Sequence, residues 1–381
     1  MNVNIIALCI VVYFTLLFLI SYKTSSNDNN STFFLGNRNS PWFVIAYGMI
    51  GTTLSGITFI SVPGWVASSQ FSYMQMVFGF FFGYLIISRI LLPLYYRLEL
   101  TSIYTYLGER LGKSSYKTGS AFFLLSRTIG ASFRLYLIAS VLQFAIFDSW
   151  NIPFILTVFI TIVLIWVYTY RSGIKTIIWT DALQTTFMLS TVIIIAYSLM
   201  NRLDLDINSL MEVIYSSSYS ETFFFDDWRN KKFFPKQFLS GMFMAIVMTG
   251  LDQDQMQKNL SCRNLKDAQK NMLTFSTILI FVDLLFLSLG ALLFIYSEQM
   301  NIPLPSNPDM LFPNIALNSG LPLYVGILFI IGIIAAAYSS ADSALTSLTT
   351  SFCVDIINFS KYSEENQIGI RKKVHLLMSV I

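Results

Sequence analysis

Long apolar stretches separated by short polar segments constrain the fold of this chain more than any other feature. There are ten such stretches. The last begins near Val374, and the sequence stops inside it, so we expect the chain to be part of a longer protein. Each of the nine before it is long enough to cross a bilayer. These nine lie at about residues 3–22, 42–68, 72–96, 118–147, 152–170, 175–200, 236–257, 271–297 and 321–356.

Composition agrees with a membrane location. Hydrophobic residues make up 55% of the 381 residues and charged residues 12%, whereas soluble domains carry about 25% charged residues. The sequence therefore predicts an all-α polytopic membrane protein, folded as a single transmembrane domain over residues 1–381, with the lipid bilayer as its surroundings.

Several function classes are excluded by what the chain lacks. His375 is the only histidine, and the three cysteines are far apart, so neither a multi-histidine metal site nor a disulfide framework is expected. No glycine-rich loop followed by Lys-Ser or Lys-Thr is present to bind phosphates. The net charge of +3 is spread over short patches and does not indicate a nucleic-acid partner. We expect no enzyme activity and no organic cofactor.

The distribution of basic residues predicts the orientation. With the N-terminus outside, the inside loops hold 16 of the 24 Lys and Arg residues and the outside loops hold 5, all between Arg202 and Lys236. Basic residues concentrate in cytoplasmic loops. We therefore expect a multi-pass protein of the cell membrane, of the bacterial inner-membrane kind, with its N-terminus outside. The long external loop 201–235 has room for a short amphipathic helix.

The second and seventh spans carry residues that interrupt helices. The second has Gly51, Gly56 and Pro63 at membrane depth, and the seventh has Gly241 and Gly250 before it turns polar. Interrupted spans in corresponding positions of two halves indicate a transporter built from an inverted repeat, and five spans separate these two. The alternative is that Gly and Pro are simply more frequent in membrane helices.

A cluster of hydroxyl groups lies in the ninth span, within GIIAAAYSSADSALTSLTTSFCVD. Ser339, Ser340, Ser343 and the carbonyl of Ala336 are spaced three or four residues apart, so they share one helix face. Neutral oxygen ligands suit a small hard cation. Stripes of small residues also serve helix packing in membranes, and the residues alone leave both readings open.

Four motifs resemble those of the sodium:solute symporter family: LSGITFISVPGW (54–65), SGIKTIIWTDALQ (172–184), GLDQDQMQKNLSCRN (250–264) and AAAYSSADSALTSL (335–348). The resemblance covers essentially the whole chain, and Lys258 stands where the family more often has arginine. It implies a leucine-transporter-type core of two inverted five-helix repeats, here 42–200 and an incomplete 236–381, after an extra N-terminal helix (1–22). Thr53, Ser55 and Thr58 are somewhat like the sialic-acid branch.

The resemblance also implies ion sites. The main sodium site would use the backbone carbonyls of Gly51, Leu54 and Ala336 and the hydroxyls of Ser339 and Ser340. Some family members have a second cation site, which here would comprise Asp181, Asp342 and Ser343, together with Ser339. A carboxylate near a helix N-terminus can also be merely favourable with the helix dipole, so the role of Asp181 stays open.

The solute site is expected beside the interruption of the second span. The polar candidates are Thr53, Ser55, Thr58, Tyr73 and Gln75. Arg127 and Arg134 are seven residues apart on one face of the fourth span, and a buried guanidinium binds carboxylates well. The alternatives are a structural pair with an internal acid such as Asp283 or an arginine that reaches the inside surface.

We assign no transport role to two further acidic features of the sequence, a single aspartate and a short polar segment. Asp283 is flanked by large apolar residues, and no motif supports a function for it. The DQDQ segment (252–255) is expected to be a capped, hydrated helix end.

The interrupted spans and the family resemblance together predict sodium-coupled uptake of a small polar organic solute by alternating access around a midplane site. The two arginines leave open whether this solute carries a carboxylate. Sodium and the solute are the expected ligands. A transporter-like sensor that binds solute without moving it is the alternative.

Overall fold

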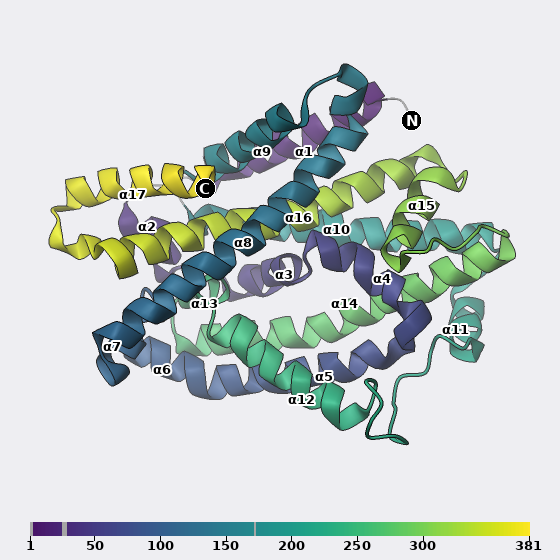
Figure 1. The fold of residues 1–381 in the computed structure, drawn as a ribbon, viewed down its shortest axis with the longest axis horizontal. Coiled ribbons are helices and arrows are strands. Elements are labelled where there is room, and N and C mark those ends of the chain that lie inside the picture. The colour runs from purple at the N-terminus through teal and green to yellow at the C-terminus, as the bar shows by residue number, and fades with distance from the viewer. Residues whose placement is uncertain (1–2, 25–28, 171–172) are drawn as a thin grey trace.

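The computed structural model describes residues 3–24, 29–170 and 173–381, and in this part of the chain helices joined by loops make up the fold, with no β-strand (Figure 1). The helices are α1 (Val3–Thr24), α2 (Asn30–Leu35), α3 (Trp42–Thr53), α4 (Gly56–Ser69), α5 (Tyr73–Ile86), α6 (Leu92–Arg97), α7 (Thr105–Leu111), α8 (Lys113–Ala145), α9 (Phe154–Thr169), α10 (Ile174–Arg202), α11 (Ile207–Ser216), α12 (Phe234–Ala245), α13 (Gln253–Leu260), α14 (Leu265–Gln299), α15 (Leu311–Asn318), α16 (Leu323–Ser351) and α17 (Glu364–Val380).

Each of the ten predicted apolar stretches is helical for most of its length. Six helical segments among the described residues are long and apolar enough to cross a membrane. One of them, Gly56–Arg97, bends at Gln70, whose φ of 54° is outside the helical range, so it is read as two spans. The last helix, α17, begins at Glu364, ten residues before the expected start at Val374.

The external loop contains the short helix that the sequence allowed. Helix α11 begins after Asp206, whose carboxylate accepts a hydrogen bond from the backbone N–H of Ser209 at 2.7 Å. This is an ordinary N-cap, and it explains why a helix forms in an otherwise polar loop.

Both predicted interruptions are present. Helix α3 ends at Thr53, Leu54 leaves the helical conformation, and Ser55 caps the start of α4 by accepting from the Thr58 N–H at 3.4 Å. The seventh span passes from α12 through a π-helical turn (Ile246–Gly250), breaks, and resumes as α13. Backbone groups freed in this way inside a membrane must be met by protein or by a cavity.

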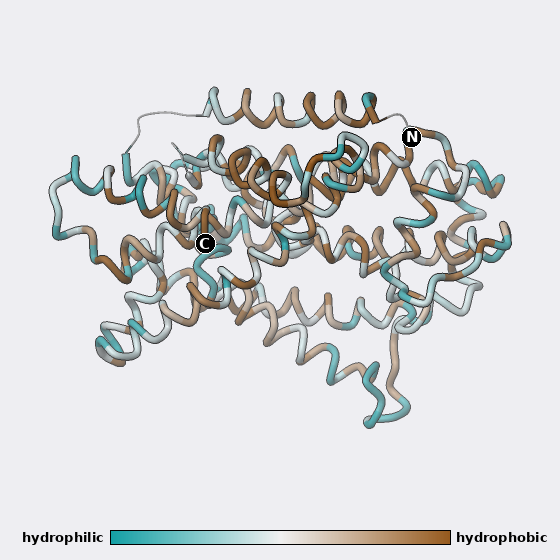
Figure 2. Tube along the Cα trace, turned by 45° about the horizontal axis from the view of Figure 1, so that its top comes forward, coloured by the Kyte–Doolittle hydropathy of each residue, from teal (hydrophilic) through white to brown (hydrophobic). Residues whose placement is uncertain are grey.

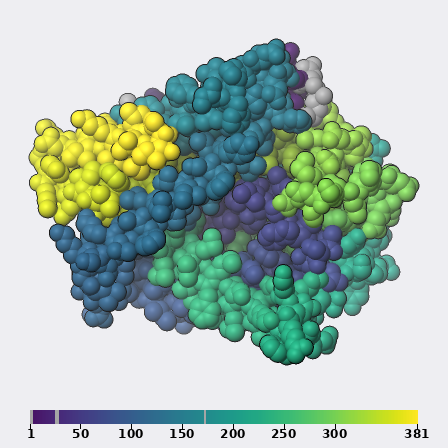
Figure 3. Space-filling model, viewed as in Figure 1, coloured from purple at the N-terminus to yellow at the C-terminus, as the bar shows by residue number. Residues whose placement is uncertain are grey.

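Helix α16 lies at the centre of the bundle, where α8 crosses in front of it and α10 packs beside it (Figure 1). Every residue from Phe329 to Ser351 is buried. Apolar colour runs along the outer helix α1, and in the space-filling view α8 covers much of one face (Figures 2 and 3). Hydroxyl-rich α16 is therefore shielded, and apolar side chains such as Leu8 and Phe133 face outward.

Candidate functional site

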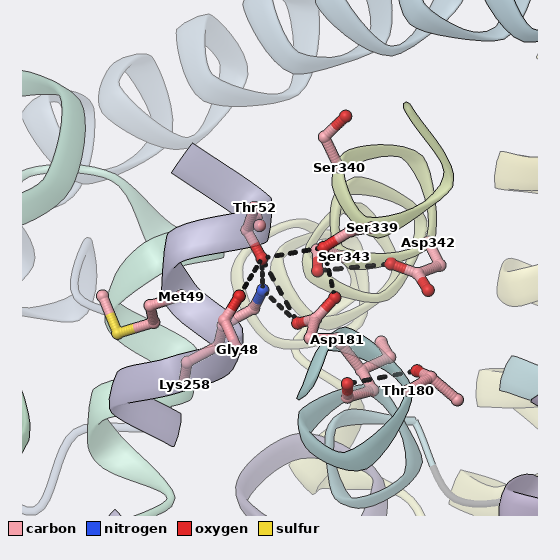
Figure 4. Close-up of polar contacts among 12 residues, drawn as sticks. Gly48, Met49, Thr52, Thr180, Asp181, Lys258, Ser339, Ser340, Asp342 and Ser343 are labelled. Atoms are coloured by element: carbon pink, nitrogen blue, oxygen red, sulfur yellow. Dashed lines mark hydrogen bonds and ion pairs between the residues drawn. The ribbon is translucent and has the colours of Figure 1, made fainter. Parts of the chain in front are cut away.

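Asp181 is the centre of a buried polar cluster between four helices (Figure 4). It lies on α10, and its two carboxylate oxygens have different partners. Ser339 of α16 donates to Oδ1 at 2.6 Å, and Lys258 of α13 forms an ion pair with Oδ2 at 2.5 Å. The lysine and aspartate side chains are each 1% exposed. A buried carboxylate is stabilised only when such partners are present.

Thr52, near the end of α3, brings the fourth helix into the cluster. Its hydroxyl accepts from the Lys258 ammonium, lies 3.2 Å from the Ser339 hydroxyl and donates to Asp181 at 3.3 Å. One turn earlier, a Cβ on Gly48 would lie 2.9 Å from the Cβ of Asp181. Glycine at this position therefore permits the close approach of α3 to α10.

The prediction of a hydrated DQDQ segment is wrong, although the predicted cap is present. Asp252 accepts from the backbone N–H groups of Asp254 at 3.0 Å and Gln255 at 3.3 Å. Every residue of α13 is nevertheless buried. Its polar side chains bond to other helices: Gln257, for example, donates to the carbonyl of Phe34 at 2.8 Å. Lys258, one of the basic residues of the predicted inside loop 257–270, is likewise buried.

The two consecutive serines of α16 point in different directions. Ser339 faces the Asp181 cluster, whereas Ser340 points away from it in Figure 4. The Ser340 hydroxyl donates to the carbonyl of Ala337 on its own helix at 3.0 Å. Because adjacent helical residues are about 100° apart, the pair can serve two different surroundings.

Both sides of the interruption in the second span reach α16. On the α3 side, Thr52 lies within hydrogen-bond distance of Ser339. On the α4 side, a Cβ on Gly56 would lie 3.0 Å from the Cβ of Ala337. The predicted neutral ligands at Gly51, Leu54, Ala336, Ser339 and Ser340 therefore come from segments that pack together. Whether all five oxygens share one ion stays a prediction.

The other members of the predicted second cation site lie on α16. Asp342 accepts from the hydroxyl of Tyr168 on α9 at 2.8 Å, and Ser343 donates to its other carboxylate oxygen at 3.4 Å. Asp342 is fully buried, as is Asp181. The acidic groups expected for this site are thus present, but the ammonium of Lys258 is already paired with Asp181.

A cavity of about 230 Å³ lies next to the interruption. Five of the seven predicted solute-binding residues line it, namely Thr53, Thr58, Tyr73, Arg127 and Arg134. The other residues lining it are Thr52, Leu54, Phe80, Tyr84, Met244, Ala245, Met248, Thr249, Gln255, Leu279 and Asp283. The cavity is therefore bounded by both interrupted spans and by α5, α8 and α14.

Two predicted solute residues have other roles. Ser55 is the N-cap of α4, and its hydroxyl is engaged with Thr58 at 3.1 Å. Gln75 is fully buried and holds the external loop: it donates to the carbonyl of Lys232 at 2.8 Å and accepts from the N–H of Phe224 at 3.2 Å. Its amide is already satisfied, so the prediction that it faces the solute site is corrected.

The two arginines of α8 differ in their partners. Arg127 forms ion pairs with Asp252 at 2.6 Å and with Asp254 at 3.7 Å, which is the structural alternative that the sequence left open, with a different acid. Arg134 donates to the backbone carbonyl of Ser340 at 3.4 Å and forms no ion pair within the described part of the chain. Arg134 thus retains donors for a ligand.

Sequence reasoning missed three residues of these sites: Thr52, Lys258 and Asp283. Thr52 is a polar residue at membrane depth in the second span, but its partners come from three other helices. Lys258 could have been found from its place in the third motif. Asp283 could have been found from its isolation among apolar residues, because intramembrane charges usually serve a function.

Comparison with known proteins finds similarity to one family along most of the chain. Residues 33–381 match the model of the sodium:solute symporter family. The sodium/sialic acid symporter SiaT of Proteus mirabilis is 25% identical over 371 residues, which cover 94% of this chain and 73% of that protein. The symporter NanT of Aliivibrio fischeri, also named for sodium and sialic acid, is 26% identical and matches over 88% of this chain and 66% of its own length.

Two solved structures share the fold. A Na⁺-coupled sialic acid symporter in its substrate-bound outward-open state superposes with a TM-score of 0.86 at 22% identity, covering 99% of this chain and 80% of that one. Mhp1, a nucleobase-cation-symport-1 family transporter in a closed conformation, gives a TM-score of 0.59 over 93% of this chain and 74% of that one. At an identity as low as 22%, this similarity shows a shared fold and no more.

Proposed function

Because the chain belongs to the sodium:solute symporter family, we propose that it is part of a sodium-coupled symporter of a small polar organic solute. The observation that carries the proposal is the contact between the interrupted second span and the hydroxyl-bearing helix α16, directly beside a polar cavity. An ion and a solute held at such a junction are exposed alternately to the two sides as the helices rock.

The coupling ion in this proposal is sodium, bound at the main site by the carbonyls of Gly51, Leu54 and Ala336 and the hydroxyls of Ser339 and Ser340. All five ligands are neutral oxygens, which suit an alkali cation that must be released in every cycle. The inward membrane potential contributes about 2.3 kcal/mol per charge per 100 mV to the movement of this ion.

At the predicted second cation site, we propose that the ammonium of Lys258 takes the place of a second sodium ion. Asp181 supplies the negative charge there, and its Oδ2 is only 2.5 Å from the lysine Nζ. A sodium ion beside Asp181, Asp342 and Ser343 would have to compete with a tethered cation of the same charge. One sodium ion per solute is the stoichiometry that this arrangement favours.

The solute in this proposal carries a carboxylate that Arg134 binds. Arg134 lines the cavity and has donors to spare, and guanidinium groups bind carboxylates through two parallel hydrogen bonds. Thr53, Thr58 and Tyr73 supply further hydrogen-bonding groups. Related proteins are named for sialic acid and, in Bos taurus, for monocarboxylates, which are carboxylate-bearing solutes.

The proposed setting is the bacterial inner membrane, with the N-terminus outside and residues 42–200 and 236–381 as the two inverted repeats. The orientation rests on the concentration of basic residues in the inside loops.

The direct test is uptake by the full-length protein in liposomes with an inward sodium gradient. Radiolabelled carboxylate solutes should accumulate only when the gradient is present, and replacing sodium by potassium should abolish accumulation. Solute binding without any accumulation would favour the alternative function of a sensor. Accumulation that is independent of sodium would overturn the proposal.

A further inference from the structure

Asp283 lies in the middle of α14 and lines the proposed solute cavity. It is 1% exposed, and its Oδ1 has no hydrogen-bond partner among the described residues. No ion pair to Asp283 is found in the same part of the chain. An ionised carboxylate without a counter-charge is costly at such a place and tends to become neutral, so a negative charge on Asp283 requires a cation beside it that the protein does not itself provide.

The cations of the cavity do not neutralise this carboxylate. Arg127 is committed to ion pairs with Asp252 and Asp254. Arg134 lies in the same cavity as Asp283, and yet the two side chains form no ion pair in the described structure. One guanidinium with free donors and one carboxylate with free acceptors thus line the same cavity of about 230 Å³.

We propose that Asp283 is a second anchor for the solute and binds its ammonium group, so that the preferred solute is a small amino-acid zwitterion. This inference rests on the proposed function, because Arg134 would hold the solute carboxylate. Because a zwitterion has no net charge, the net charge that crosses with it is that of the sodium ion alone. A hydroxyl in place of the ammonium would leave Asp283 without a cationic partner and would bind less tightly.

The test uses three solutes of nearly the same size: leucine, 2-hydroxyisocaproate and leucinamide. In the full-length protein with sodium, leucine should bind at least about tenfold more tightly than either analogue, measured by isothermal calorimetry or by thermal shift. Asp283→Asn should lower the affinity for leucine at least about tenfold and leave that for 2-hydroxyisocaproate unchanged. Asp226→Asn, a change in the exposed external loop, is the matched control.

Two readouts keep this inference separate from the proposed function. The sodium concentration that half-saturates the sodium-induced thermal shift reports on the coupling ion, and Asp283→Asn should leave it unchanged. If wild type binds leucine no better than 2-hydroxyisocaproate, the zwitterion proposal is overturned while sodium coupling stands. A change in sodium affinity in Asp283→Asn, with solute preference intact, would also overturn it, because the carboxylate would then serve the ion.

Folding of the variant is checked independently. Removing an unpaired buried carboxylate should not weaken the fold, so Asp283→Asn without solute should melt at or above the wild-type temperature. A clear fall in melting temperature would mean that Asp283 stabilises the bundle, and the ligand role would be lost.

Discussion

Asp181 and Asp283 are both buried acids at membrane depth, and they differ in whether the chain supplies a partner for the carboxylate. Asp181 is bonded to Lys258 and Ser339 at 2.5 and 2.6 Å, whereas Asp283 has no ion pair among the described residues. The first acid has its cation built into the chain. The second lines a cavity, and in our proposal its cation is supplied by the solute. The comparison teaches that a lone intramembrane acid can be assigned a role only after its partners are known.

The largest expected effect comes from removing the tethered cation. Lys258→Met should lower the free energy of unfolding by about 3–5 kcal/mol in sodium-free buffer, because it leaves Asp181 buried without a counter-charge. Chemical denaturation of the detergent-solubilised protein measures this. The exposed Lys266→Met is the matched control and should change little. An unchanged stability of Lys258→Met would end the distinction between the two acids.

Sodium should partly restore what Lys258→Met loses. If the ammonium stands in for a second sodium ion, the variant gains a vacant cation site, and sodium should stabilise it more than it stabilises wild type. The dependence of solute uptake on sodium concentration should also become steeper. Identical sodium dependence in both proteins would contradict the substitution of lysine for an ion.

The double variant Lys258→Met with Asp181→Asn should recover much of the lost stability, because neither buried charge remains. The interaction energy from the double-mutant cycle should reach about 2–3 kcal/mol, near the upper end for contacting residues. Strictly additive losses would mean that the two side chains do not stabilise each other.

Replacement of the second acid should act in the opposite direction and by less. Asp283→Leu should leave the free energy of unfolding unchanged or raise it by about 1 kcal/mol, since an unpaired polar group is removed from the interior of the bundle. The same denaturation measurement applies. A loss comparable to that of Lys258→Met would show that Asp283 is paired after all.

The sequence was sufficient for the features that depend on local chemistry. The interruption of the second span was predicted from Gly51, Gly56 and Pro63, and the structure places it at Leu54 and Ser55, directly before Gly56. The hydroxyl face of the ninth span was also visible in the sequence, as an ion site or a packing stripe, and the structure adds that this helix is buried. The cavity at the break was expected, and Arg134 was among its predicted residues.

Features that depend on distant partners could not be read in the same way. Lys258 follows a polar segment and so resembles a loop lysine, but its ion pair is to a residue 77 positions earlier. Gln75 was placed at the solute because it begins the third span, whereas its amide is used by the loop near Phe224 and Lys232. Side-chain direction at a span end is set by tertiary contacts, which sequence spacing does not specify.

The most direct test of the sodium site is Ser340→Ala, measured as the sodium concentration that half-saturates solute uptake. Ser347→Ala is the matched control, because its hydroxyl also donates at 3.0 Å to a carbonyl three residues earlier on the same helix. Loss of one neutral ligand, about 1 kcal/mol, should raise the half-saturating sodium concentration of Ser340→Ala about threefold to tenfold. Ser347→Ala should match wild type. Equal sodium dependence in all three proteins would contradict the proposed ion site at the interrupted helix.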